Sequence, residues 1–266
     1  MRKLISVLFL FSCTCAAFGA PWGILESAAV ERGDDVPRFI IFKVASGETI
    51  NYCIDNFSSV PDETVSSRVE QSFNEWMGGT YKYIRKSSRA KEFEDLKDIL
   101  TRPVKLNKVD CGYLPYDKEE DIPSALKEIN KQRTAPASED IRFIFVNKGK
   151  SSDCSSNSST GCHRGGEKTS KGFIPQQIQV IATNDGYSTL LHEVGHSLGL
   201  SDQYLSARGN SYELYGSSTV NPSVMDDAQT IKCDDAEGII NVLDCVVLKK
   251  SRGGQEGWRS ICPGSK

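Results

Sequence analysis

The stretch His192-Glu193-Val194-Gly195-His196-Ser197-Leu198-Gly199-Leu200-Ser201-Asp202 decides how this sequence is interpreted. Two histidines four positions apart lie on one face of a helix, where both imidazoles can reach one zinc ion. Glu193 lies between them and can act as general base toward a water that zinc activates. Gly199 can end the helix in a left-handed conformation. The chain can then double back, so we predict one catalytic Zn²⁺ held by His192, His196 and Asp202.

The first twenty residues have the pattern of a secretory signal peptide. Two basic residues precede the apolar residues 4–11, and Ala17-Phe18-Gly19 offers small residues for cleavage. The apolar run is short for a membrane span, and no later stretch approaches spanning length. We therefore expect residues 1–20 to be removed and the protein to be secreted, either extracellular or periplasmic. A lipid anchor on Cys13 or Cys15 is the alternative.

The bulk composition is typical of a soluble globular protein. Hydrophobic residues make up 38% of the 266 residues and charged residues 25%, which is ample for a buried core. The net charge is -3 and becomes -5 once the two basic residues of the signal peptide are removed. This mildly acidic balance provides no field that would attract nucleic acid. We expect a monomer without nucleic-acid binding and without a stable membrane span.

Seven of the nine cysteines follow the signal peptide, and disulfides are expected in an exported protein. The odd number leaves at least one cysteine free or paired elsewhere. A bridge between Cys154 and Cys162 is predicted because it would close a flexible Ser-rich loop. The other pairings stay open.

Hydrophobic patterning predicts a mixture of strands and helices. We expect strands at residues 39–44, 141–146 and 173–182, and helices at 62–77, at 91–100, at the zinc motif and after Cys233. Gly78-Gly79 is expected to stop the first helix. Pro175 indicates an edge strand, since proline cannot donate to a ladder. The predicted fold class is α+β, with a twisted mixed sheet, an edge strand, an active-site helix and a C-terminal helix.

Two motifs together resemble the metzincin clan of zinc endopeptidases. The motif at 192–202 matches the clan's long zinc signature in spacing, and Asn221-Pro222-Ser223-Val224-Met225-Asp226 resembles its Met-turn. The resemblance implies a metzincin-like zincin with Met225 as a hydrophobic floor beneath the metal. It implies a single zinc metalloprotease-like catalytic domain at residues 21–266. The upper part of this domain would extend to about residue 199, and the lower part would cover 200–266.

The third metal ligand is where this sequence departs from most of the clan. Most members have a histidine at the position of Asp202, and an aspartate there is similar to the small snapalysin-type secreted peptidases. Glu237, on the predicted C-terminal helix, is the alternative ligand. His163 is the only other histidine. We expect it in an exposed loop, although a second metal site there is conceivable.

Together these expectations predict that the protein is a secreted zinc-dependent endopeptidase. Glu193 would take a proton from the attacking water and later deliver one to the leaving amine. A peptide or protein substrate would lie extended along the edge strand near Gln177 to Ala182. Two alternatives stay open: a zinc-dependent amide hydrolase acting on a non-protein substrate such as peptidoglycan, and a non-catalytic secreted binding module with a zincin fold.

Overall fold

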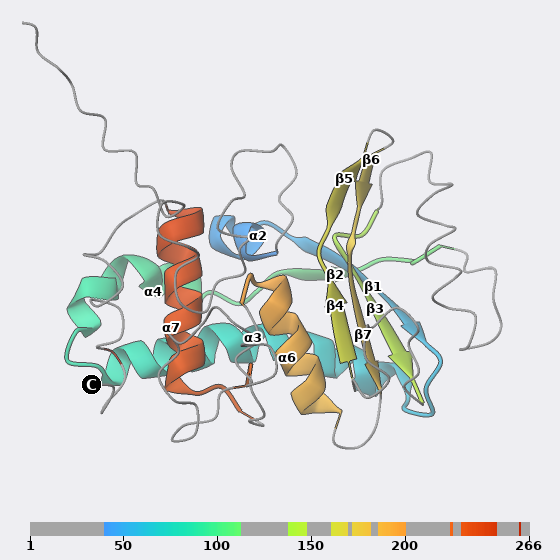
Figure 1. The fold of residues 1–266 in the computed structure, drawn as a ribbon, viewed down its shortest axis with the longest axis horizontal. Helices are drawn as coiled ribbons and strands as arrows, with labels where there is room; N and C mark the ends of the chain where they lie inside the picture. The colour runs from blue at the N-terminus through green and yellow to red at the C-terminus, as the bar shows by residue number, and fades with distance from the viewer. Residues whose placement is uncertain are drawn as a thin grey trace, which may run out of the picture.

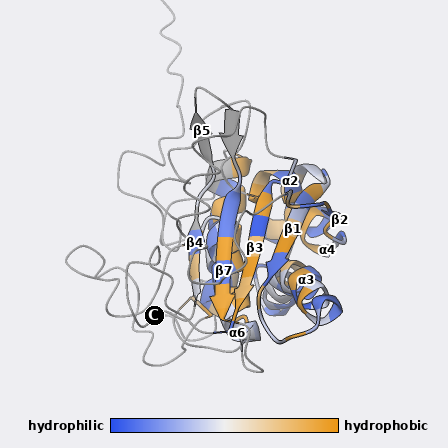
Figure 2. Cartoon of the chain, turned by 90° about the vertical axis from the view of Figure 1, so that its right-hand side faces the viewer, coloured by the Kyte–Doolittle hydropathy of each residue, from blue (hydrophilic) through white to orange (hydrophobic). Residues whose placement is uncertain are grey.

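The computed structural model describes residues 40–112, 138–147, 161–169, 172–181, 186–200, 224–225, 230–248 and 261. These residues form a mixed α/β fold built on a five-stranded sheet (Figure 1). Across the sheet the strands are β2 (Leu106–Lys108), β1 (Ile50–Asn56), β3 (Ile141–Val146), β7 (Gln176–Ile181) and β4 (Gly161–Arg164). Neighbouring strands are parallel except for β4, which runs antiparallel to β7 (Figure 2). β5 (Glu167–Thr169) and β6 (Gly172–Ile174) form a separate antiparallel pair.

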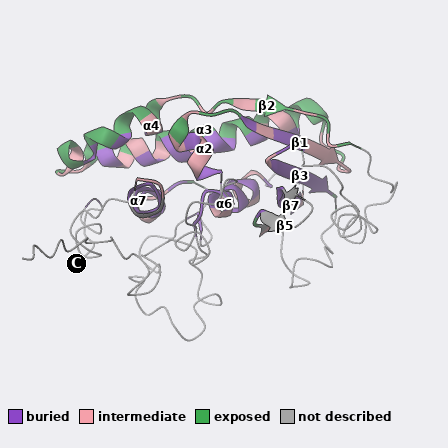
Figure 3. Cartoon of the chain, turned by 90° about the horizontal axis from the view of Figure 1, so that it is seen from above, coloured by how far each residue is buried: buried purple, intermediate pink, exposed green. Residues whose placement is uncertain are grey.

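Helices pack against this sheet and against one another. The long helix α3 (Asp62–Lys86) contacts both α6 (Tyr187–Ser197) and α7 (Cys233–Asn241). Figure 3 shows the buried side of α3 turned toward those two helices and its exposed side turned away. The remaining helices are short: α2 (Ile41–Ser46), η1 (Ala90–Leu96), α4 (Lys97–Thr101) and η3 (Val242–Val247). The helix predicted after Cys233 is confirmed, whereas the single helix predicted at 91–100 is divided into the 3-10 helix η1, with non-helical backbone angles at Phe93, and the short α4.

The main core lies between the sheet and the helices. In β3 the side chains alternate between the two faces of the sheet. Phe143 belongs to the main core and meets the rings of Tyr52 and Phe73 edge-on, at centroid distances of 6.2 and 6.4 Å. Ile144 and Val146 pack in a second, smaller cluster. Both faces of β3 are buried, which explains the continuous apolar run that predicted this strand correctly.

The prediction of a strand at 39–44 is wrong, because α2 occupies this segment. Ile41 and Val44, three positions apart, both face the core, as a helical repeat requires. Gly47 closes the helix with a φ of +74°. The backbone N–H of Ile40 donates to the carbonyl of Ser197 at 3.0 Å, so α2 also braces the end of α6. Tertiary contacts of this kind override the strand preference of the individual residues.

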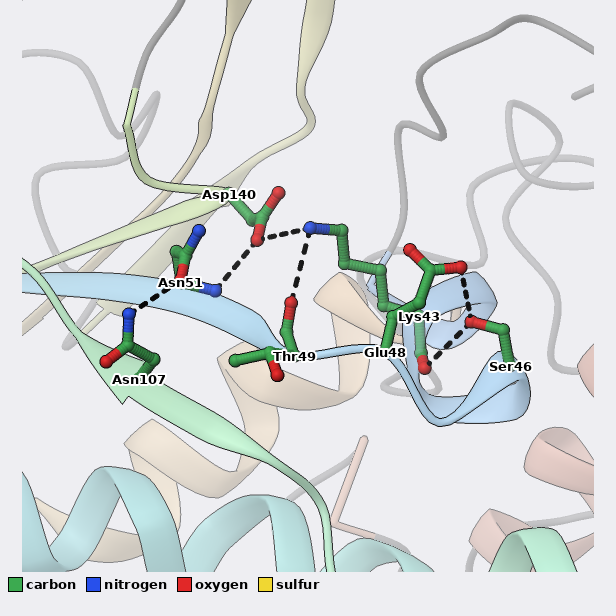
Figure 4. Close-up of polar contacts among 7 residues, drawn as sticks. All are labelled: Lys43, Ser46, Glu48, Thr49, Asn51, Asn107 and Asp140. Atoms are coloured by element: carbon green, nitrogen blue, oxygen red, sulfur yellow. Dashed lines mark hydrogen bonds and ion pairs between the residues drawn. The ribbon is translucent and has the colours of Figure 1, made fainter.

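Lys43 joins α2 to the sheet (Figure 4). Its ammonium group lies 2.7 Å from Asp140 Oδ2, and the same oxygen accepts a hydrogen bond from the backbone N–H of Asn51 at 2.8 Å. Asn51 in turn accepts a hydrogen bond from Asn107 at 2.9 Å. The polar contacts therefore connect the start of β1 to α2, β2 and the residue before β3.

The predicted stop of the first helix at Gly78-Gly79 is also wrong, because α3 continues to Lys86. Thr80 and Ile84 extend its buried stripe by two further turns. Gly79 packs closely on Ile231, where an added Cβ would come within 3.1 Å of that side chain. Glycine at this position thus allows α3 to pack closely against the segment that contains Ile231. The gain from this packing outweighs the low helix propensity of glycine.

The predicted strand at 173–182 is divided, and it is not an edge strand. Pro175 separates β6 from β7, and β7 pairs on both sides, with β3 and β4. Ile178 and Val180 are buried on one face as expected. Within the described residues the edge on this side of the sheet is β4, in a region expected to be a loop.

One disulfide, between Cys53 and Cys111, ties β1 to the segment that follows β2. Cys162 and Cys233 each take part in a further disulfide. Cys154, the predicted partner of Cys162, lies outside the described residues. No helix in the described part of the chain has the length and apolar character needed to cross a bilayer.

Candidate functional site

Helix α6 carries the two histidines and the glutamate of the zinc motif. The rings of His192 and His196 lie 4.8 Å apart between centroids and are nearly perpendicular, at 87°. The helix is anchored to α3 at two points. Trp76 Nε1 donates to the carbonyl of Leu191 at 2.8 Å, and the Tyr187 hydroxyl donates to Glu75 at 2.7 Å. The two imidazoles therefore project from a braced helix.

Both imidazoles are oriented by backbone carbonyl groups. Nδ1 of His192 lies 2.9 Å from the Val224 oxygen, and Nδ1 of His196 lies 2.8 Å from the Leu200 oxygen. A carbonyl oxygen only accepts, so each Nδ1 carries the hydrogen, and in the neutral ring Nε2 carries the lone pair. Histidines that bind metals through Nε2 are held in this way by outer-shell acceptors. The pair thus fits a zinc ion chemically.

Gly199 produces the turn that places the Leu200 carbonyl beside His196. Its φ is +97°, in the left-handed region predicted from the sequence. The backbone N–H of Leu200 then donates to the Gly195 carbonyl at 3.0 Å, which folds the chain back onto α6. Asp202, two residues further on, lies outside the described residues.

Met225 is fully buried beneath α6, against Gly195. A Cβ added at Gly195 would lie 2.5 Å from the Met225 sulfur and 2.7 Å from Cζ2 of Trp76. Only glycine therefore allows the methionine and the tryptophan to approach the helix this closely. The preceding residue, Val224, supplies the carbonyl that orients His192. Met225 was predicted from the sequence, whereas the packing role of Gly195, which lies inside the zinc motif itself, was not.

Asp235 on α7 holds the turn at Val224 and Met225. Its carboxylate accepts backbone N–H bonds from Val224 at 2.9 Å, from Met225 at 3.3 Å and from Lys232 at 2.7 Å. Burial raises the pKa of Asp235 to about 6, although the three N–H donors act in the opposite direction. A buried carboxyl group thus supports the turn that orients a candidate ligand. Asp235 was not predicted from the sequence as part of the site.

Asp235→Asn tests this burial through the pH dependence of stability. A carboxyl group whose pKa is raised on folding binds its proton more tightly in the folded state, so its contribution to stability falls as pH rises from about 4 to about 6. The shift from the ordinary 3.8 to about 6 corresponds to about 3 kcal/mol. Urea unfolding at pH 4 and pH 7 should show the wild type losing that stability relative to the variant. Asp98→Asn, on the exposed side of α4, is the matched control. An equal difference at both pH values would contradict the prediction.

The edge strand β4 lies directly against Glu193. A Cβ added at Gly161 would come within 2.8 Å of Glu193 Oε1 and 2.6 Å of the Thr189 methyl group. Glu193 is only 5% exposed. Gly161 therefore allows the backbone of the edge strand to lie beside the carboxylate of the candidate general base.

The expectation that His163 lies in an exposed loop is wrong. His163 lies in β4, partly buried, with its ring centroid 5.8 Å from that of His196. Its Nε2 lies 2.9 Å from Gln176 Oε1. Burial, and to a lesser degree the neighbouring His196, lower the pKa of His163 to about 3. All three histidines of the chain are therefore gathered at one site.

No group of three His, Cys, Asp or Glu side chains is close enough to hold a metal ion among the residues that the structure describes. Neither His163 nor the buried Glu237 of α7 thus completes a ligand set with His192 and His196. Asp202, the predicted third ligand, is not among those residues, so its role stays a prediction.

No family model and no curated protein matches this chain in sequence. Among solved structures, archaemetzincin from Methanopyrus kandleri is similar with a TM-score of 0.35 and 15% identity, over 73% of this chain and 96% of that protein. A structure described as a chaperone–substrate complex is similar with a TM-score of 0.33 and 12% identity, over 77% of this chain and 35% of the other. Similarity this weak does not assign a family.

Proposed function

We propose that this chain is a secreted zinc-dependent endopeptidase. The observation that carries the proposal is the pair of Nδ1–H···O=C hydrogen bonds, which present Nε2 of His192 and of His196 as metal ligands. The carboxylate of Glu193 accompanies them on the same helix, beside the edge strand. A histidine pair that served only the core would not need this carboxylate.

The residues that would hold zinc are His192, His196 and Asp202. Two imidazole nitrogens and one carboxylate oxygen suit Zn²⁺, and three protein ligands leave a position open for catalysis. When bound, zinc acts as a Lewis acid on the scissile carbonyl and makes water a stronger nucleophile.

Glu193 is proposed to move the proton. As general base it takes the proton of the attacking water, and as general acid it delivers a proton to the leaving amine. Its low exposure limits competing bulk water, and Gly161 allows the edge strand to lie beside it. The substrate site is proposed along the outer edge of β4, in place of the Gln177 to Ala182 segment expected from the sequence. There an extended peptide can add a strand through backbone hydrogen bonds.

Secretion is part of the proposal. The signal-like pattern of residues 1–20 supports it, and so does the disulfide between Cys53 and Cys111, because such bridges persist in oxidising compartments.

Metal analysis combined with a substrate panel tests the proposed function. We expect about one zinc per purified chain by mass spectrometry, since one set of three protein ligands is proposed. We expect hydrolysis of casein that a zinc chelator abolishes and added zinc restores. Zinc binding with cleavage of peptidoglycan but not of casein would favour the non-protein amide hydrolase. Zinc binding without any hydrolysis would favour a binding module, and absence of zinc would overturn the proposal.

A further inference from the structure

His163 lies on the face of β4 that is turned toward α6. Side chains alternate along a strand, so residues 161 and 163 share one face. Gly161 on that face lies against Glu193, and the ring of His163 lies beside that of His196. Figure 1 shows β4 and α6 side by side, and the two elements are in contact. The edge strand thus places one glycine over the candidate base and one histidine beside a candidate ligand.

Gln176 fixes which ring nitrogen of His163 can meet another molecule. In the antiparallel register His163 pairs with Ile178, so Gln176 is its diagonal neighbour on the same face. The Gln176 side chain is buried, and its amide oxygen accepts from Nε2 of His163 at 2.9 Å. Nε2 therefore carries the hydrogen, and Nδ1 is left as a hydrogen-bond acceptor.

We propose that His163 is a substrate-contacting residue whose Nδ1 accepts a hydrogen bond from a peptide bound along β4. The inference rests on the proposed function, because it assumes that the outer edge of β4, an edge of the sheet within the described residues, holds the substrate. His163 as a whole residue keeps intermediate exposure, so a chain bound along β4 would lie next to it. Among the described residues His163 forms no three-ligand group with His192 and His196.

This contact has a consequence for specificity. An acceptor beside the reacting centre favours a hydrogen-bond donor of the substrate, either a backbone N–H or a side chain such as that of Ser, Asn or Lys. A site built to accept such a bond discriminates against groups that cannot donate, because its polar atom is then left buried without a partner. Gln176 acts as the positioning residue, since it fixes the ring and its tautomer.

Binding of fluorescein-labelled casein to the zinc-loaded Glu193→Gln protein tests the proposal without relying on turnover. His163→Phe in that background keeps a planar ring but removes both nitrogens. We expect the dissociation constant from fluorescence anisotropy to rise about 10-fold, as for the loss of one hydrogen bond. Zinc content should stay unchanged. His163→Ala should give the same loss and serves if the larger ring disturbs packing. Gln179→Leu is the matched control, because Gln179 lies on the opposite face of β7 and should not affect binding.

Three results would overturn the proposal: unchanged casein affinity in both His163 variants, loss of zinc from them, or an equal loss of affinity in Gln179→Leu. Loss of zinc would make His163 a metal ligand. Failure of the proposed function would give a different result from failure of the proposed contact at His163. In that case wild-type protein would not hydrolyse casein, yet the Glu193→Gln protein would still bind it in a manner that depends on His163.

Discussion

Glu193→Gln is expected to reduce casein hydrolysis by about 10²- to 10⁴-fold, the contribution usual for a positioned general acid–base group. Glutamine has nearly the same shape, so it should keep the close approach to Gly161. It cannot take a proton from the attacking water, however. Because Glu193 is not a proposed ligand, the zinc content should remain that of the wild type. The measurement is kcat/KM for casein together with metal content on the same preparation.

The matched control is Glu94→Gln, which makes the same chemical change on an exposed side chain that pairs with Lys97. It should leave both kcat/KM and zinc content unaltered. A fully active Glu193→Gln protein would contradict the proposed base. Loss of zinc from Glu193→Gln would instead show that the carboxylate binds the metal.

Local sequence signals were sufficient for the helix that carries the site. The spacing of His192 and His196 predicted one helix face, and Gly199 predicted the left-handed residue after it; both are confirmed. The apolar run at 141–146 predicted β3 with the right bounds. In each case the information lies within a few residues, because it depends on helix or strand periodicity.

The errors occurred where distant segments decide the structure. The strand formers at 39–44 fold as a helix that braces Ser197, and Gly79 stays inside α3 because it packs on Ile231. His163 could be placed only once β4 was known to pair with β7. Pairing between segments more than ten residues apart leaves no periodic signal in either of them.

The hydrogen bonds that hold the site in place could not be predicted from the sequence either, because they also join distant segments. Val224 links α7 to α6 through two hydrogen bonds: its backbone N–H donates to Asp235, and its carbonyl accepts from His192. An aspartate in the first turn of a helix usually indicates only favourable interaction with the helix dipole. Its contact with a turn ten residues earlier depends on tertiary structure, which the sequence does not display.

Asp202→Ala is expected to weaken zinc binding by more than about 100-fold, while Glu237→Gln should leave it unchanged. Loss of an outer-shell partner alone costs 10- to 100-fold in metal affinity, so removal of a direct ligand should cost more. Glu237 is 3% exposed within α7, and it forms no three-ligand group with the two histidines among the described residues. Glutamine is chosen at this position because it preserves the volume of a buried side chain.

Competition against a zinc-chelating dye measures both affinities, with circular dichroism to show that each variant is folded. His192→Ala provides the reference for loss of a ligand, and Asp202→Ala should approach it. The reverse pattern, with Asp202→Ala unaffected and Glu237→Gln impaired, would move the third ligand to the C-terminal helix. Gly199 argues for Asp202, because its left-handed turn already folds the chain back toward His196 at Leu200, two residues before the aspartate. Only a ligand that follows this turn closely would make use of that reversal.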